Sequence, residues 1–190
     1  MANKNAPFGL RAIGKVGQNR DNQGLSEYSI AANNTTTIYF QDAVKPMASG
    51  TIQHADAGDI LLGSLNGVFY TDPTTSKPTF ANHYAQVNAS DIVAFVSDDP
   101  YERFEIQTDI STASQQTDVF MNADIVISTG STANFVSNSM LDDGTLSTTS
   151  GQLKIMSPST NIDNSDIASG HVNWVVMINE HIYNSATAGI

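Results

Sequence analysis

The chain has 190 residues, of which 19 are acidic and eight are basic, so its formal net charge is −11. A surface this acidic repels nucleic-acid phosphates and anionic lipids, and the sequence therefore predicts neither a nucleic-acid partner nor a membrane partner. Cysteine is absent, which excludes disulfides, thiolate metal sites and a cysteine nucleophile. Charged residues make up only 14% of the chain, and the abundant Ser, Thr and Asn favour strands joined by many turns.

The N-terminal 25 residues differ from the rest of the chain. Glycines occur at positions 9, 14, 17 and 24, and strand-forming residues are few. Four of the eight basic residues also lie here: Lys4, Arg11, Lys15 and Arg20. Glycines make a segment costly to order alone, so we expect residues 1–25 to form an extended N-terminal arm. Residues 26–190 are then expected to form one folded domain.

From residue 26 onward, short apolar runs rich in β-branched and aromatic residues alternate with turn residues, which predicts strands. The expected strands are Glu27–Ala31, Thr37–Phe40, Ile60–Leu65, Gly67–Tyr70, Ile92–Ser97, Arg103–Thr108, Asp124–Ser128, Leu153–Met156 and Val172–Ile182. Asn66 and Gly67 favour a two-residue hairpin turn. Only Thr112–Met121 offers a short helix, and Ser128–Gly151 is expected to form long loops around one hairpin. The pattern predicts an all-β, mostly antiparallel fold, either a β-sandwich or a β-barrel-like domain.

The last of these strands is apolar on both of its faces. Val172, Trp174, Val176 and Ile178 alternate along one face, and Val175 and Met177 lie on the other. Strands of this kind are covered on both sides. We therefore expect Trp174, the only tryptophan, to be buried in the core.

The segment Gly9–Val16 comes close to a phosphate-binding loop, because Gly9, Gly14 and Lys15 have the required spacing. The next position needs a Ser or Thr hydroxyl to bind magnesium, but Val16 occupies it. We therefore expect no nucleotide site here and interpret the segment as part of the glycine-rich arm.

Other candidate chemistry is equally incomplete. The four histidines, His54, His83, His171 and His181, have no ligand-pair spacing. Turns explain Asp98–Asp99 and Asp142–Asp143 better than acid–base catalysis does, because each pair precedes Pro or Gly. The oxygen-rich segment Asn161–Asp166 lacks the glycine and the final glutamate of a calcium loop. No serine-hydrolase elbow is present either. We therefore expect no enzymatic activity, no cofactor and no metal.

Four stretches of sequence stand out as a set. They are Asn5–Arg11, Asp98–Pro100 with Phe104–Gln107, Asn122–Asp124 with Gly130–Thr132, and Trp174–His181. In this order, and over most of the chain, they resemble a family of small head proteins encoded near the major capsid protein in tailed phages. Ala12 stands where the family has a proline. None of the four stretches is a catalytic motif, so the resemblance depends on the set.

The resemblance implies a decoration (cement) protein on the outer surface of the capsid, with the major capsid protein as its partner. An acidic chain suits the outside of a shell that holds polyanionic DNA. Attachment at threefold points favours a homotrimer. We expect the arm residues Pro7, Phe8, Leu10 and Arg11 to contact the capsid or a neighbouring copy rather than the domain core.

A different virion role is the main alternative. A tail or fibre-associated protein could bind host glycan, and Tyr70, Tyr84 and Tyr101 lie near turns where they could stack on sugar rings. Fibre proteins, however, are typically repetitive, and this chain has no internal repeat. A small hydrolase is the third possibility, and no convergent motif favours it.

Overall fold

The computed structural model describes residues 3–17, 24–184 and 189–190. Over these ranges the protein contains thirteen strands, two short 3-10 helices and no α-helix, and every strand pairing is antiparallel. The predicted all-β, mostly antiparallel fold is therefore confirmed. It is consistent with a β-sandwich, and the described strands form no closed barrel.

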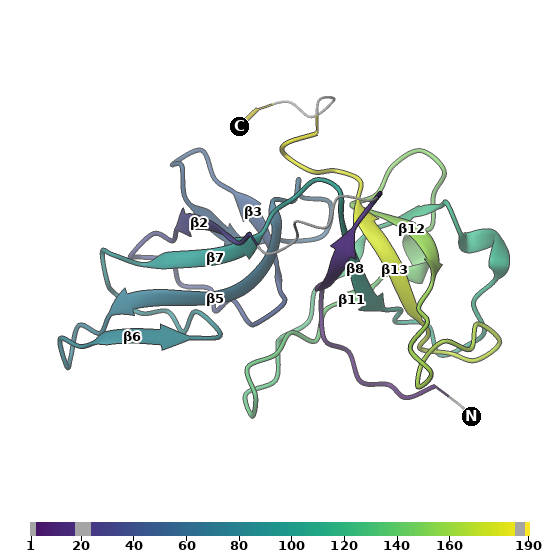
Figure 1. Cartoon of the computed structure of the whole chain (residues 1–190), viewed down its shortest axis with the longest axis horizontal. Helices are drawn as coiled ribbons and strands as arrows, with labels where there is room; N and C mark the ends of the chain where they lie inside the picture. Colours follow the sequence, from purple (N-terminus) through teal and green to yellow (C-terminus); the bar gives the residue numbers. More distant parts are fainter. Residues whose placement is uncertain (1–2, 18–23, 185–188) are drawn as a thin grey trace.

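A six-stranded sheet forms one end of the molecule, which we call the first lobe (residues 24–97) (Figure 1). Its strands are β2 (Ser26–Ser29), β3 (Ala43–Pro46), β4 (Ile52–His54), β5 (Gly63–Thr71), β6 (Pro78–Ala81) and β7 (Val93–Ser97). The order is β2-β7-β5-β3-β4, with β6 paired to the other end of β5. Val68 on β5 and both Ala94 and Val96 on β7 point into a buried apolar core, which holds this sheet against its loops.

A five-stranded sheet forms the second lobe (residues 3–17 and 98–184), in the order β1-β8-β13-β12-β9. Its strands are β1 (Arg11–Lys15), β8 (Glu102–Gln107), β9 (Asn122–Ala123), β12 (Leu153–Pro158) and β13 (Asn173–Ile178). Trp174 at the centre of this sheet is 0% exposed and lies opposite Ile106 and Pro158. The predicted burial of the tryptophan is confirmed.

The less regular segments of the second lobe contain short elements. Strand β10 (Ile125–Val126) pairs with β11 (Met140–Leu141), which lies inside the predicted loop region Ser128–Gly151, and residues 127–139 form the long connection between the two strands. The 3-10 helix η1 (Gln116–Asp118) is the only helical turn inside the segment that was expected to offer a helix. A second one, η2 (Asp143–Thr145), follows β11.

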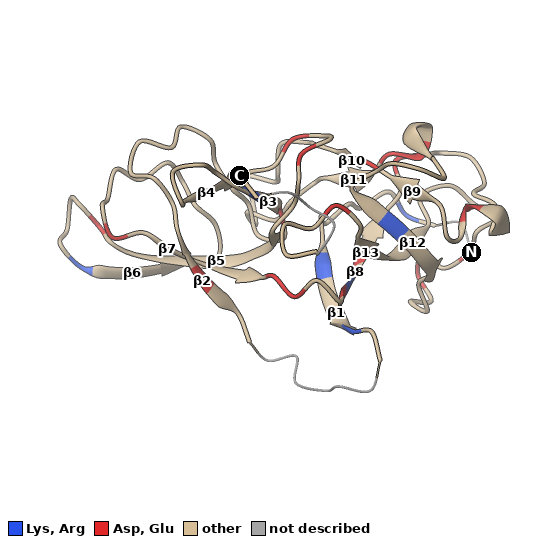
Figure 2. Ribbon diagram, turned by 90° about the horizontal axis from the view of Figure 1, so that it is seen from above, with Lys and Arg blue, Asp and Glu red and all other residues tan. Residues whose placement is uncertain are grey.

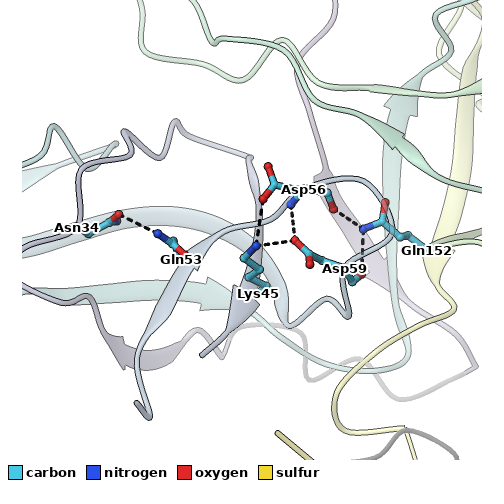
Figure 3. A network of polar contacts seen from close by, with 6 residues as sticks. All are labelled: Asn34, Lys45, Gln53, Asp56, Asp59 and Gln152. Carbon is cyan, nitrogen blue, oxygen red and sulfur yellow. Dashed lines mark hydrogen bonds and ion pairs between the residues drawn. The ribbon is translucent and has the colours of Figure 1, made fainter. Parts of the chain in front are cut away.

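A buried amide joins the two lobes (Figure 3). The Nε2 of Gln152 donates to the carbonyl oxygens of Asp56 and Asp59, both at 2.9 Å, and its Oε1 accepts from the Ile125 N–H at 3.1 Å. Lys45 Nζ in turn binds the carboxylates of Asp56 at 3.1 Å and Asp59 at 2.7 Å. Every polar atom of the Gln152 side chain is thus satisfied, and this contact fixes the lobes against each other.

The prediction of a separate N-terminal arm is wrong for the described residues 3–17. Arg11–Lys15 forms strand β1, which pairs with β8. Leu10 is 1% exposed and belongs to the core of the second lobe, so the expectation that it contacts a partner is also wrong. Its N–H donates to the Gln41 carbonyl at 2.8 Å, and its carbonyl accepts from the Ser64 hydroxyl at 2.6 Å. The rest of the predicted arm includes residues 1–2 and 18–23, which lie outside the described residues.

Close packing explains the glycines that suggested a flexible arm. A Cβ at Gly9 would lie 2.3 Å from the Gln41 carbonyl oxygen and 2.5 Å from the Ser137 Cβ, closer than any side chain could fit. Gly9 also has a φ of +75°, in the left-handed region that glycine adopts most readily. The chain therefore needs a glycine at position 9 to pass between the lobes. Gly9 reflects close packing of the backbone and is not a sign of a flexible arm.

The predicted Asn66–Gly67 hairpin is also wrong, because both residues lie inside the nine-residue strand β5. The register of β5 against β7 shifts between Leu65 and Gly67, as in a β-bulge. Gly67 has a φ of +154°, and a Cβ there would lie 3.0 Å from the Ala81 carbonyl oxygen. The glycine thus serves a bulge and a close strand approach, and the two predicted strands on either side form one.

His181 is buried where the lobes meet, and it forms an isolated bridge with Leu61. Its Nδ1 accepts a hydrogen bond from the Tyr183 N–H at 3.0 Å, so this nitrogen must be unprotonated. Burial lowers the pKa of His181 below its ordinary value of 6.5, although the nearby Asp98 carboxylate acts in the opposite direction. The folded protein therefore holds this imidazole in its neutral form at neutral pH.

We expect acid to destabilise the fold through His181. Because the pKa is lower in the folded chain, the unfolded chain binds the proton first as the pH falls through about 6.5, and stability present above that pH is lost below it. The loss reaches up to about 1.4 kcal/mol per pH unit until the folded imidazole also titrates. Urea denaturation at about pH 7.5 and about pH 5.5 measures it. His181→Gln should lose less between these two values, and an equal loss in both proteins would contradict this account.

Candidate partner-binding surface

The solvent-facing side of the first lobe's sheet carries three phenylalanines. Phe69 lies on β5, Phe80 on β6 and Phe95 on β7. Phe69 is directly opposite Phe80, and Phe95 is directly opposite Gly67. Side chains alternate between the two faces of a strand, so Val68 points into the core while its neighbour Phe69 points outward. The three rings therefore share one face.

These rings contact one another and remain exposed. Phe80 is 69% exposed and Phe69 is 37% exposed, whereas Phe95 is half-buried. The ring centroids of Phe80 and Phe95 are 5.4 Å apart with planes inclined at 27°, and those of Phe69 and Phe80 are 6.4 Å apart. Gly67 lies directly beside this stack, since a Cβ there would be in ordinary van der Waals contact with the Phe80 ring at 3.7 Å. We call Phe69, Phe80 and Phe95 the aromatic patch.

The strands that carry the aromatic patch have no charged residue, and Figure 2 shows β5, β6 and β7 without red or blue. Charges lie at the border instead. Glu27 is opposite Phe95 in the register of β2 and β7, and Lys77 directly precedes β6. A contiguous apolar surface bordered by polar residues is typical of a protein–protein contact.

The predicted contact residues Phe8 and Arg11 come together, but in an internal contact. The Arg11 guanidinium lies 4.4 Å from the centroid of the Phe8 ring and forms an ion pair with the buried carboxylate of Glu105. Glu105 also accepts hydrogen bonds from the Ser159 hydroxyl at 2.6 Å and the Asn173 amide at 3.2 Å. Burial raises the pKa of Glu105, and the Ser159 and Arg11 contacts more than offset this and lower it below its ordinary value.

Pro7 is half-buried, and neither Pro7 nor Phe8 is assigned to a core cluster. Contact of Pro7, Phe8 and Arg11 with a capsid or a neighbouring copy stays a prediction. The aromatic patch was not predicted from the sequence. Phe69 lies between Val68 and Tyr70 in a continuous apolar run, so the alternation that reveals the outward face is hidden.

The three tyrosines that could stack on a glycan in the alternative function do not form a platform. Tyr84 is fully buried, with its hydroxyl bonded to the Asn34 carbonyl at 2.9 Å, and Tyr70 is also buried. Only Tyr101 is exposed. Tyr70 and Tyr84 are thus unable to contact a sugar.

The polar segment Asn161–Asp166 is organised by hydrogen bonds within the chain. The Asn164 amide donates to the carbonyl oxygens of Lys4 at 2.8 Å and His171 at 2.7 Å. Within residues 3–17, 24–184 and 189–190, no cluster of three or more His, Asp or Glu side chains has an arrangement that could hold a metal ion.

Comparison of the chain with protein-family models, with curated proteins and with solved structures gave no match. In the described part of the chain, no helix has the length and apolar character needed to cross a bilayer. The functional argument therefore depends on the sequence and on the aromatic patch.

Proposed function

We propose that the protein is a decoration (cement) protein of a tailed-phage head, with the major capsid protein as its partner and the outer surface of the shell as its location. The aromatic patch is the observation that carries this proposal. It is an exposed apolar surface on a rigid sheet, and a structural protein needs such a surface to attach to a larger assembly. The resemblance of the sequence to small phage head proteins supports the same role.

The physical properties of the patch suit repeated, moderate-affinity attachment. Burying one Phe side chain contributes roughly 1.5–3 kcal/mol, and Phe80 has most of its surface still to bury. The sheet holds the three rings in place before binding, which limits the entropic cost of ordering them. Many copies on one shell then stabilise it together, because each bridges neighbouring capsid subunits.

The charge of the chain supports a place outside the shell. With a formal net charge of −11, the protein is repelled by packaged DNA. The three rings carry no charge, and the exposed Glu27 lies opposite Phe95 at their border, so a capsid surface that is apolar over the rings and basic beside Glu27 would complement this face. A homotrimer at threefold points remains the favoured assembly, since closed symmetry allows each copy to contact the same capsid surface.

Replacing Phe80 with serine tests the proposal. We expect Phe80→Ser to reduce binding to purified expanded capsids by roughly tenfold or more, because the most exposed ring of the patch is lost. Its melting temperature should change little, since an exposed side chain contributes little to the core. Cosedimentation of the protein with capsids gives the occupancy, and thermal denaturation gives the stability.

Phe120→Asn is the matched control for this test. Phe120 lies on the second lobe, is 79% exposed and has a φ of +75°, which asparagine tolerates well. This variant also removes one exposed ring but leaves the aromatic patch intact, and it should bind capsids like the unmodified chain. Undiminished binding of Phe80→Ser, or an equal loss in Phe120→Asn, would exclude the patch as the attachment surface.

A further inference from the structure

A polar cleft lies between the two lobes, apart from the three rings of the aromatic patch. Its volume is about 480 Å³, within the range of small-molecule sites. The first lobe contributes the consecutive threonines 35–37 together with Tyr39, His54, Asp56 and Gln86, and the second lobe contributes residues 127–129. The cleft is thus built from both lobes, whose relative position is fixed by the Gln152 contact.

The buried Gln152 amide also holds Asp56, one of the residues that line the cleft, in position. Figure 3 shows the Gln152 side chain pointing at the main chain of Asp56, to whose carbonyl oxygen it donates at 2.9 Å. Lys45 holds the Asp56 carboxylate from the other direction at 3.1 Å. One wall of the cleft is therefore positioned in advance of any ligand, which lowers the entropic cost of binding.

A buried carboxylate positions two further residues of the cleft. Asp42 is fully buried, and its Oδ2 accepts from the Tyr39 N–H at 2.7 Å and lies 3.3 Å from His54 Nε2. Gly130 supports the Tyr39 ring from the second lobe, since a Cβ there would lie only 2.3 Å from that ring. Tyr39 and His54 are thus held in fixed orientations at the edge of the cleft.

The chemistry of the lining selects a class of ligand. The described residues that line the cleft include no Lys or Arg, and the neighbouring Lys45 is already paired with the carboxylates of Asp56 and Asp59, so the lining does not favour a phosphate or another anion. Ile127 is the only aliphatic side chain, which disfavours an apolar ligand. Thr and Ser hydroxyls and the Gln86 amide both donate and accept hydrogen bonds, as sugar hydroxyls do. Tyr39 also lines the cleft and is only half-buried, and a tyrosine ring can stack against the C–H face of a sugar.

We infer that this cleft binds a neutral carbohydrate chain. The hollowed surface continues beyond the cleft, because Thr35 also lines two adjoining cavities of about 390 and 340 Å³, the larger of which includes the apolar side chains of Met47 and Ile52. Asn34 and Gln53, whose amides contact each other at 3.4 Å, line the larger of the two. The site therefore accommodates more than one sugar residue. This binding site is independent of the aromatic patch, and a negative result here leaves the proposed capsid attachment unchanged.

Neutral trisaccharides of glucose, galactose and N-acetylglucosamine are the probes that test this inference. Saturation-transfer NMR on the full chain detects binding, and titration gives the affinity. The double variant Thr36→Val and Thr129→Val removes two exposed hydroxyls of the cleft without changing side-chain shape. We expect it to weaken the binding of the best trisaccharide by about tenfold, with an unchanged melting temperature.

The matched control is the double variant Thr74→Val and Thr148→Val, which removes two exposed hydroxyls that do not line the cleft. It should bind the trisaccharide like the unmodified protein. The inference is overturned if none of the three trisaccharides binds. It is also overturned if the cleft variant keeps full affinity, or if the control variant loses as much affinity as the cleft variant.

Discussion

Replacing Trp174 with alanine is expected to lower the free energy of unfolding by about 3–5 kcal/mol. The side chain is 0% exposed at the centre of the five-stranded sheet, where β13 has a strand on each side, and neighbouring positions on β8 and β12 are apolar. Removing the indole loses its burial and leaves a cavity that a two-sided sheet cannot collapse to fill. Urea denaturation followed by far-UV circular dichroism measures the change, since the variant lacks the only tryptophan.

Phe120→Asn serves as the comparison, because it removes an aromatic ring that is already in solvent. Its free energy of unfolding should stay within about 0.5 kcal/mol of the original value, as for most surface substitutions. A loss below about 1 kcal/mol for Trp174→Ala would show that the tryptophan does not anchor the core.

Deleting residues 2–20 is expected to lower the free energy of unfolding by more than about 4 kcal/mol, enough to unfold a marginally stable domain. The deletion removes strand β1 from the sheet and Leu10 from the core. It also leaves the buried Glu105 without the Arg11 guanidinium, and an unpaired buried charge is strongly destabilising. Thermal denaturation of the truncated chain measures this effect directly.

A pair of point variants separates core packing from the loss of chain length. Leu10→Ala should cost about 2–4 kcal/mol, because the side chain is almost fully buried. Ile13→Ala, on the exposed side of the same segment, should cost less than about 1 kcal/mol. A truncated chain that melts like the original would restore the idea of a detachable arm and contradict the structure.

Local patterns of the sequence were sufficient to predict the fold class. Strands β7, β8, β12 and β13 lie within a few residues of the predicted Ile92–Ser97, Arg103–Thr108, Leu153–Met156 and Val172–Ile182. Each is a short β-branched or aromatic run bounded by turn residues, so the information lies within the segment itself. Burial of Trp174 followed from the same kind of local alternation.

Features that depend on distant residues could not be predicted in this way. A glycine in the sequence is compatible with either a flexible segment or a tight contact. At Gly9 the close approach of the Gln41 carbonyl shows that the glycine is needed for a tight contact. Asn66–Gly67 has the composition of a hairpin turn, but β5 continues through both residues because it pairs with β6 and β7. In both cases the deciding neighbour is far away in the sequence.

The candidate surface was hidden for the same reason. Phe69, Phe80 and Phe95 lie on three different strands, and nothing within any one segment indicates that the rings stack. Tyr84 shows the opposite error, because its position near a turn suggested exposure while the fold buries its ring completely. A surface assembled across strands becomes visible only when the strand register is known.

Capsid attachment through the aromatic patch is the central claim, and cryo-electron microscopy of expanded heads of the corresponding phage, mixed with the purified protein, tests it most directly. The account predicts ordered density for the chain on the outer surface of the shell, with Phe69, Phe80 and Phe95 buried against the major capsid protein. Shells without added density, or bound copies whose three rings face solvent, would contradict it.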